Sequence, residues 1–396
     1  MVCREEFINS ISYDYCPDEL PPVADRVQSV LRARFIDELT GHAIKAQLTV
    51  SSQLNNVVAR ASSTAVAGLT GNPARLFPML DVNTVNLNMR VACRRFISQT
   101  FHADLGPFNI LVGDPADYPE FFTPVDLGDI ALHRAASFIT GRCVQDNGIS
   151  RTPLSNVAVD ISGLWHQFPA AHVDPITVLE VPRIISLLHG LYADRQAGVD
   201  QIRQRNLLPQ IGEEKTLLLP ASADSRQIRL SNRVNLAVGS VLGIDIAHND
   251  LVEYLQVLSI DGASTATQPA TITLAYPLSK FHREGTSVVR VIPQAAGTTN
   301  NLLRDAVAND QTLFLDALTD ISDSTVEISG SGTTEYHPVR LYSVLSDADG
   351  YFSLPPISRV AMMQLHASHA GPVADVDLIF SPDYEQFENR IDLIFS

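Results

Sequence analysis

Two aspartates in the stretch SDADGYFSLPPISR (residues 346–359) have the type and spacing of cation ligands or of a catalytic pair. Asp347 and Asp349 lie two residues apart in a glycine-containing turn, beside Tyr351 and Phe352. Carboxylate oxygens are ligands that Ca²⁺ prefers, but a calcium loop of the EF-hand kind also needs further oxygen ligands and a bidentate Glu. Neither follows Asp349. The same residues also suit a plain hairpin turn, so the rest of the chain must decide between these alternatives.

Three further groups of polar residues have spacings that would suit chemistry. His366 and His369, in QLHASHAG, would bind a metal from one face of a helix. Their surroundings instead predict a strand that runs into a turn, which places them on opposite faces. His282, in KFHREG, is predicted to be a loop residue. Asp126 and Asp129 resemble paired carboxylates, but their spacing across a glycine is common in linkers. We expect no metal at these positions.

The cysteines and the short motifs offer no catalytic alternative. Cys3, Cys16, Cys93 and Cys143 form no Cys-x-x-Cys pair, so neither a zinc site nor a disulfide framework is predicted. Cys93 and Cys143 lie in apolar stretches, where cysteine usually is a small buried hydrophobe. The sequence contains no His-Glu-x-x-His, no Gly-x-Ser-x-Gly elbow and no phosphate loop. We therefore expect that the protein is not an enzyme and has no cofactor.

Charge and hydropathy exclude two classes of partner. The 396 residues include 44 acidic and 28 basic ones, for a formal net charge of −16. Such a chain repels phosphate backbones, so we expect no nucleic-acid partner. The polar start of the chain lacks the apolar core of a secretion signal, and the most apolar stretch, residues 235–247, is short and carries Asp245. We expect no membrane span, and synthesis in the cytoplasm without a signal peptide.

The elements that would position these residues are mostly strands. Short runs of alternating apolar residues, separated by Gly, Asn, Asp and Pro, predict a mainly β, multi-domain protein. After an N-terminal extension (residues 1–25), residues 26–112 have the pattern of a first β-sandwich. Two of its strands flank DELTG (37–41), which suits a tight hairpin. The Pro-rich stretch that follows predicts a linker over 113–129.

The second unit begins with a pattern that resembles a known family. FITGRCVQDNGISRTPLSNVAVDISG (138–163) reads apolar-x-Gly-Arg-apolar, a turn, a Pro-Leu pair and an alternating strand. This order is similar to the first half of the carboxypeptidase regulatory-like domain, a transthyretin-like β-sandwich. The second half of that family, Thr-Asp-x-x-Gly-x-Phe, resembles SDADGYF (346–352), with Ser346 in place of Thr.

The resemblance implies both a split domain and a role for the opening turn. In this family the Asp caps backbone N–H groups, the Gly takes the left-handed conformation and the aromatic residue enters the core. The structural turn would then comprise Asp347, Asp349, Gly350 and Phe352. Because the two halves lie far apart in this sequence, we infer a second sandwich from residues 130–165 and 336–396, interrupted by an insertion over 166–335.

The start of the insertion has a helical spacing. VPRIISLLHGLYADRQAGVDQIRQRN (181–206) predicts a helix, because Pro182 suits an early helical position and Ile185, Leu188 and Tyr192 approximate one face.

The rest of the insertion predicts two small β-modules, at 215–293 and 303–335. QTLFLDALTDISDSTVEISG (311–330) resembles KTLLLPASADSRQIRLSN (215–232), and Glu335-Tyr336 matches Glu253-Tyr254. These matches suggest a duplicated module.

The predicted parts favour a binding or packing protein. Residues 238–262, with 272–291, are similar to segments of proteins from phage-tail-like contractile injection systems. The hypothesis is therefore a structural or accessory component (baseplate, fibre or collar), present in several copies among other protein subunits of a particle that is released. The alternative is a carbohydrate-binding or adhesive protein, although one Trp and 7% aromatic residues weigh mildly against it. A peptidase accessory subunit would rest on the family name alone.

Overall fold

The structure, a computed structural model, is built from β-strands. It describes residues 4–8, 11–15, 28–52, 56–59, 66–71, 85–105, 125–166, 182–262 and 265–396. No described residue is helical and 53% of the chain lies in strands, which confirms the mainly β class. The chain divides into two compact units, residues 1–135 and 136–396.

The described residues of the first unit form two sheets, in the orders β6-β3-β9 and β5-β4-β7-β8, besides a separate β1–β2 ladder. Its strands are β1 (Arg4–Ile8), β2 (Ile11–Tyr15), β3 (Gln28–Asp37), β4 (Gln47–Ser52), β5 (Asn56–Ala59), β6 (Val66–Gly71), β7 (Val85–Ala92), β8 (Gln99–Leu105) and β9 (Val125–Leu132). Leu31, Ala33 and Phe35 alternate along β3 and are buried, as expected for a strand with one face in the core.

Two predictions about the first unit are wrong. The predicted linker ends inside β9, which pairs in parallel with β3, and the unit extends to residue 135, not 112. The alternation of Val125, Leu127 and the following apolar residues is a strand pattern that the Pro-rich stretch before it obscures. The tight turn at DELTG forms as predicted: the Asp37 N–H donates to the His42 carbonyl at 2.9 Å, Ile36 and Ala43 form an antiparallel bridge, and Gly41 has φ +69°. The strand β4 that follows pairs in the other sheet. Residues 113–124 lie outside the described residues.

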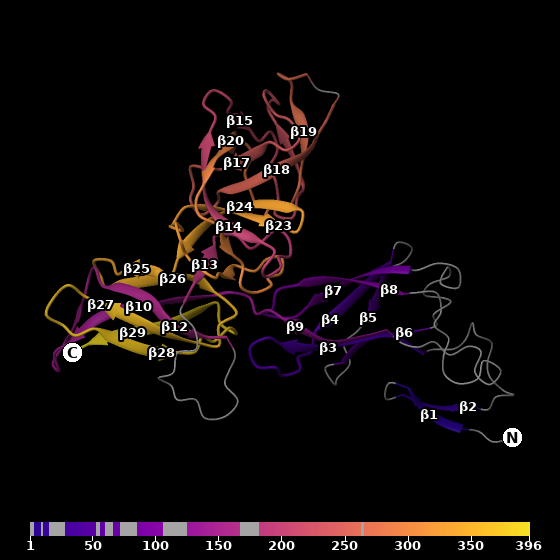
Figure 1. The fold of residues 1–396 in the computed structure, drawn as a ribbon, viewed down its shortest axis with the longest axis horizontal. Helices are drawn as coiled ribbons and strands as arrows, with labels where there is room; N and C mark the ends of the chain where they lie inside the picture. Colours follow the sequence, from indigo (N-terminus) through magenta and orange to yellow (C-terminus); the bar gives the residue numbers. More distant parts are fainter. Residues whose placement is uncertain are drawn as a thin grey trace. The chain divides into compact units, whose positions relative to one another are not determined.

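The second unit contains a sandwich of two sheets whose strands come from both ends of the insertion (Figure 1). Its strands are β10 (Ser137–Asp146), β11 (Arg151–Pro153), β12 (Ala158–Trp165), β25 (Ser343–Leu345), β26 (Tyr351–Ile357), β27 (Met362–Ser368), β28 (Val376–Phe380) and β29 (Glu388–Phe395). In one sheet β10 pairs with β11, antiparallel with β26 and parallel with β29. In the other the order is β25-β12-β27-β28.

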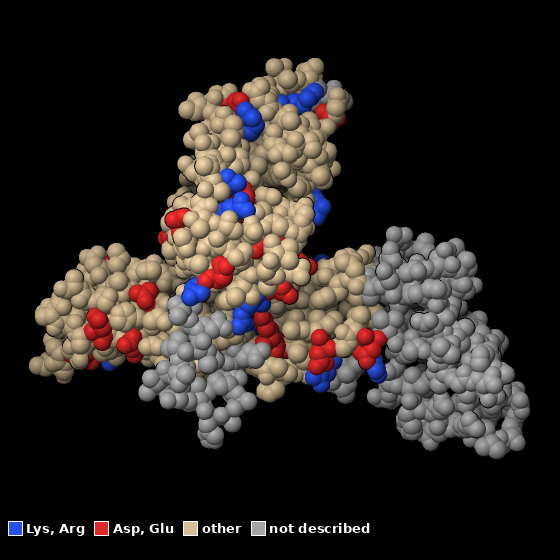
Figure 2. Space-filling view, in the orientation of Figure 1, with Lys and Arg blue, Asp and Glu red and all other residues tan. Residues whose placement is uncertain are grey.

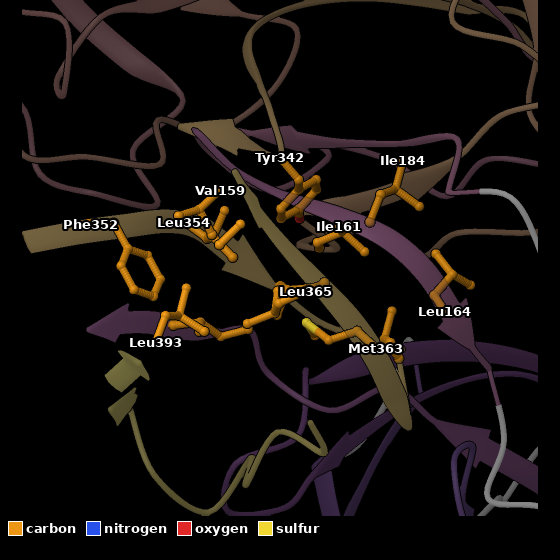
Figure 3. Packing of buried hydrophobic residues seen from close by; sticks show 14 of the residues in the cluster. Val159, Ile161, Leu164, Ile184, Tyr342, Phe352, Leu354, Met363, Leu365 and Leu393 are labelled. Atoms are coloured by element: carbon orange, nitrogen blue, oxygen red, sulfur yellow. The ribbon is translucent and has the colours of Figure 1, made fainter. Parts of the chain in front are cut away.

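The sandwich core joins residues from both sides of the insertion (Figure 3). Val159 and Ile161, before the insertion, pack with Leu354, Leu365 and Leu393 after it. Since Ile139 lies opposite Leu354 in the β10–β26 ladder, the two halves of the resemblance pattern are hydrogen-bonded neighbours. The predicted second boundary is misplaced: residues 336–341 end β24 (Thr333–Leu341), a strand of the insertion, and the sandwich resumes at β25.

The predicted helix at 181–206 is wrong. This segment holds β13 (Ile184–Leu187), a loop and the start of β14 (Gln201–Pro209). It pairs with β22 (Thr312–Phe314) on one side and with β24 on the other. All four of its residues are buried, because Ile184 packs into the sandwich core on one face and Ile185 and Leu187 pack into the core of the second lobe on the other. A strand buried on both faces reads as a short apolar run, which periodicity alone does not separate from a helix.

The insertion contains two lobes (Figure 1). The first lobe, residues 213–296, holds β15 (Lys215–Thr216), β16 (Gln227–Leu230), β17 (Val241–Ile244), β18 (Glu253–Ile260), β19 (Ala270–Leu274) and β20 (Ser287–Ala296). The second lobe, residues 182–209 with 300–341, holds β13, β14, β21 (Asn300–Asn301), β22, β23 (Thr325–Gly330) and β24. Each lobe has its own apolar core, and six strands from both lobes close a ring, β18-β17-β20-β14-β23-β24.

The two lobes repeat the same backbone pairings. A bridge joins Leu217 to Leu230 in the first lobe, and a matching bridge joins Leu302 to Leu315 in the second. The two copies of the repeated module, copy one (residues 182–260) and copy two (270–341), exchange strands. Strands β13 and β14 of copy one pair within the second lobe, and strands β19 and β20 of copy two pair within the first. The predicted modules therefore have the wrong boundaries, and the predicted alignment of 311–330 with 215–232 is in the wrong register. That alignment rests on two similar Thr-Leu runs, whereas the matching bridges show that Leu217 is equivalent to Leu302.

A buried polar junction fixes the second lobe to the sandwich. The hydroxyls of Tyr342 and Ser186 both donate to the carbonyl of Pro356, at 2.8 and 3.1 Å. The Ser358 N–H donates to Thr312 Oγ1 at 2.8 Å. Tyr342 also belongs to the sandwich core (Figure 3), so the insertion is packed onto its host and not merely tethered.

Candidate functional site

Two buried glutamates begin equivalent strands at the seam between the lobes. Glu253 starts β18 and is fully buried, and Glu335 lies at the start of β24 and is 2% exposed. The residues that follow them, Tyr254 and Tyr336, lie opposite each other where β18 and β24 pair. The ring of strands closes at this pair. A buried carboxylate is costly unless it is paired, so the surroundings of each glutamate decide what it does.

Glu253 is held by the loop that precedes β20. It accepts N–H groups from Ser279 at 2.8 Å and Lys280 at 2.9 Å, and its Oε1 lies 2.9 Å from Nε2 of His282. Burial opposes the charged form, but the hydrogen bonds from His282 and the Ser279 amide outweigh it and hold the pKa of Glu253 below its ordinary value. The carboxylate therefore stays ionised and pins the loop.

Glu335 is held in the same manner by the loop that precedes β14. It accepts the Tyr192 N–H at 3.0 Å and a guanidinium N–H of Arg195 at 2.5 Å, and lies 2.7 Å from Nε2 of His337. Burial again opposes ionisation, while His337 and Arg195 lower the pKa of Glu335. Arg195 also donates to Asp200 at 3.1 Å, so the guanidinium bridges two buried carboxylates.

Tyr192 and His189 connect the two lobes across the seam. The Tyr192 hydroxyl donates to Glu253 at 3.2 Å, while its own backbone N–H serves Glu335. Burial, together with the charge of Glu253, raises the pKa of Tyr192 well above its ordinary value, so the hydroxyl remains a donor. His189 lies 2.9 Å from the carbonyl of Val252, and burial lowers its pKa to about 4. This network can hold loops in place, and its charges are already paired within the protein.

A cavity of about 310 Å³ opens beside this network. Its lining comes from both lobes and includes Val252 and Tyr254 of the first lobe and Ser324, Thr325 and Arg340 of the second. It lies where β18 and β24 separate after the Tyr254–Tyr336 pair.

The opening turn has the geometry of a structural hairpin. Asp347 Oδ1 accepts the N–H groups of Asp349 at 2.9 Å and Tyr351 at 2.8 Å. Gly350 has φ +77°, and Phe352 is 3% exposed in the sandwich core. The aspartate oxygen thus caps backbone donors of its own turn. Among the described residues, no cluster of three or more His, Cys, Asp and Glu side chains is arranged to hold a metal ion.

The other candidate carboxylates lie apart from the seam. Asp126 and Asp129 of β9 form exposed ion pairs with Arg32 and Arg34 of β3, respectively. Arg32 Nε donates to Asp126 at 2.7 Å and Arg34 Nη2 to Asp129 at 2.7 Å. Such exposed pairs add little to stability. They are strand residues, which corrects their placement in a linker.

The candidate histidines and cysteines also separate. His366 Nδ1 lies 3.0 Å from Asp377, whereas the ring of His369 accepts the N–H of Gly371. His282 is indeed a loop residue, but it is 1% exposed and binds Glu253. Cys143 is buried in β10, and burial raises its pKa to about 11. Cys93 lies just after β7 and is half-buried.

Sequence reasoning missed the seam network. The one sequence signal at this place is the repeated Glu-Tyr dipeptide, which by itself indicates only a duplication. Because Glu253 and Glu335 occupy the same place in both copies, an acidic residue at the start of an apolar strand in each copy marks a buried anchor. Arg195 and His282, which occupy matching loop positions, share no side-chain chemistry that a sequence comparison would align.

Each sheet of the sandwich has two edges among the described strands, β29 and β26 with β11 in one sheet and β25 and β28 in the other. Among the described strands, β28 pairs only with β27 and β29 only with β10. Ile379 of β28 is 38% exposed and Ile394 of β29 is 43% exposed. The face in Figure 2 carries few charged side chains over the insertion. No helix of the described residues is long and apolar enough to cross a membrane.

Comparison with known proteins gives no family. No family model matches the sequence, and no curated protein matches it. Two solved structures of BcpA, the major pilin subunit of Bacillus cereus, are each 8% identical to this chain. One of them, an Asp-to-Ala variant, covers 93% of this chain and 99% of its own, with a TM-score of 0.19. The other covers 94% of this chain and 100% of its own, with a TM-score of 0.19. The Bacillus anthracis TIE protein is 9% identical, with 93% of this chain and 50% of that chain covered and a TM-score of 0.19. Likeness at this level carries no argument about fold or function.

Proposed function

We propose that the chain is a non-catalytic structural or accessory subunit of a phage-tail-like contractile injection particle, and that it acts through protein–protein contacts of its sandwich. The resemblance of residues 238–262 and 272–291 to proteins of such systems supplies the class of particle. Assembly in the cytoplasm and release with the particle belong to the same proposal.

The observation that carries the proposal is the exposure of apolar side chains on two of the sandwich edges, β28 and β29. A strand paired on one side only presents backbone N–H and C=O groups to a partner strand. Such edges are usually protected by charge, and β29 has Glu388, Arg390 and Asp392 exposed. Ile379 and Ile394, half-exposed on these edges, instead offer apolar contact. Together these features suit a specific neighbour better than open solvent.

The buried junction supports the role of a stiff subunit in an assembly. Because Tyr342 and Ser186 tie the second lobe to the Pro356 carbonyl of the sandwich, a contact made by the insertion is transmitted to the sandwich without a hinge between them. A subunit that spaces its neighbours needs this stiffness.

The test is affinity purification of the tagged full chain from cells that produce it, followed by velocity sedimentation. We expect the chain to sediment with sheath-, tube- and baseplate-type subunits in one large particle, identified by mass spectrometry. A matched Ile379→Asp and Ile394→Asp double variant should fold but leave the particle fraction. A wild-type chain that sediments only as a free protein contradicts the proposal.

A further inference from the structure

We propose that the cavity at the seam between the two lobes binds a neutral, hydroxyl-rich ligand of about one sugar ring, such as a pyranoside. The proposal is independent of the particle assignment, since it rests on the cavity alone. A volume of about 310 Å³ lies at the small end of the range for ligand pockets, about 300–1,000 Å³, which favours a single ring over a longer chain.

The lining has the two kinds of surface that a sugar ring needs. Ile246 and Val252 supply apolar contact and Tyr254 adds an aromatic side chain, which suits the C–H face of a pyranose. Asn249 and Ser324 supply hydrogen-bonding groups, and no hydrogen bond joins either side chain to another described residue. These groups are therefore available to ligand hydroxyls.

The charges around the cavity do not favour an ion. Asp323 and Arg340 contribute one negative and one positive charge to the lining. Asp323 Oδ1 accepts the Leu341 N–H at 2.7 Å, which fixes the carboxylate, and Arg340 reaches Asp250 at 3.4 Å. A fixed carboxylate with a free oxygen accepts hydrogen bonds from ligand hydroxyls, and the guanidinium donates them. The lining thus holds one charge of each sign and has no excess of either.

At the matching place in the other copy a side chain is hydrogen-bonded to the neighbouring backbone. Gln256 of β18 lies opposite Val241, just as Pro338 of β24 lies opposite Thr325, so Gln256 and Pro338 are equivalent. The Gln256 amide donates to the Gly239 carbonyl at 3.2 Å, which satisfies that position internally. Pro338 has no side-chain donor and makes no such hydrogen bond. The duplicated fold therefore differs at the place where the cavity opens.

The experiment is ligand-observed saturation-transfer NMR on the full chain, with a panel of methyl glycosides at millimolar concentration. At least one glycoside should give a saturable signal. Asn249→Ala, Ser324→Phe and Arg340→Ala, at partly or fully exposed positions, should each weaken its binding tenfold or more. Gln256→Ala, at the equivalent position, is the matched control and should leave the affinity unchanged. Circular dichroism verifies that each variant is folded.

Three results would overturn the proposal. The first is that no glycoside of the panel binds. The second is that a glycoside binds but the three cavity variants bind it as tightly as the parent chain does. The third is that inorganic phosphate or an alkylammonium ion competes for the same residues with higher affinity, because the recognised chemistry would then be ionic.

Discussion

Glu253 and Glu335 occupy the same structural position in the two copies of a duplicated, strand-swapped module. Each accepts an N–H from the loop that leads into a ring strand, Glu253 from Ser279 at 2.8 Å and Glu335 from Tyr192 at 3.0 Å. Each also binds a buried cationic or imidazole side chain contributed by the other copy, His282 and Arg195 respectively. The glutamates therefore hold the exchanged arms in place.

Glu335→Ala should lower the free energy of unfolding by about 3–5 kcal/mol, because it leaves the buried Arg195 without one of its two carboxylate partners. Urea unfolding followed by circular dichroism measures the loss. Glu284→Ala, the same change at an exposed loop position, is the control and should have an effect of about 0.5 kcal/mol or less. Equal losses for the two variants would show that Glu335 anchors nothing.

Gly350→Val should destabilise the sandwich by about 3 kcal/mol, the upper end of the usual cost of a strained residue. Gly350 has φ +77°, and an added Cβ would lie 2.6 Å from the carbonyl oxygen of Cys143. Gly148→Val should show the cost of backbone strain without a steric collision, since Gly148 has φ +80° with open space around it. The difference between the two variants then measures the collision with Cys143. If thermal unfolding shows the same loss for both variants, close packing of the turn against β10 contributes nothing.

Stability should fall as the pH drops from about 6.5 to about 4 because of His189. Burial lowers the pKa of His189 to about 4 in the folded chain, so the unfolded chain binds more protons in this window. The free energy of unfolding should therefore be about 3 kcal/mol lower below pH 4 than above pH 6.5 on account of this group. His366 acts in the opposite sense: its hydrogen bond with Asp377 raises its pKa, and that stabilisation is lost at higher pH.

The measurement is the urea midpoint of the parent chain and of His189→Gln across this pH window. The variant should show a flatter slope whatever its absolute stability. Parallel slopes would mean that His189 is not the group that titrates.

Deletion of residues 388–396 should abolish folding of the sandwich. This segment contains β29, which pairs with β10 along its whole length and buries Leu393 and Phe395. Removing two buried side chains costs about 3–5 kcal/mol each, comparable to the whole stability of a domain. Circular dichroism of the truncated chain tests this, with His369→Ala as a full-length control that should fold. A truncated chain with native strand content would refute the role of β29.

The sequence predicted the split sandwich because its constraints are backbone constraints. Gly141 of the resemblance pattern lies where a Cβ would collide with the Ile391 carbonyl of β29, and Asp347 and Gly350 shape a turn by local rules. Such positions admit few residue types, so a single sequence is enough to recognise them. The helix prediction failed because Ile185, Leu188 and Tyr192 have helical spacing, whereas Ile184 and Ile185 are buried in two different cores whose other residues lie far away in sequence.

The seam network was out of reach for a different reason. Tyr192 touches Glu335 through its backbone and Glu253 through its hydroxyl, and these partners come from two copies whose strands are exchanged. Neither composition nor spacing reveals an exchange of strands, because the same sequence would fit a fold in which each copy pairs only with itself. Only the three-dimensional pairing of β13, β14, β19 and β20 shows which loop meets which glutamate.

The central claim, that the sandwich acts through its strand edges in an assembly, is tested most directly by hydrogen–deuterium exchange of the chain alone and within its purified particle. We predict slower exchange in the particle for residues 376–380 and 388–395, at amides that do not face β27 or β10. Those amides of β26 that face β10 serve as an internal reference and should exchange equally in both states. Unchanged exchange at both edges in a chain that is present in the particle would contradict the account.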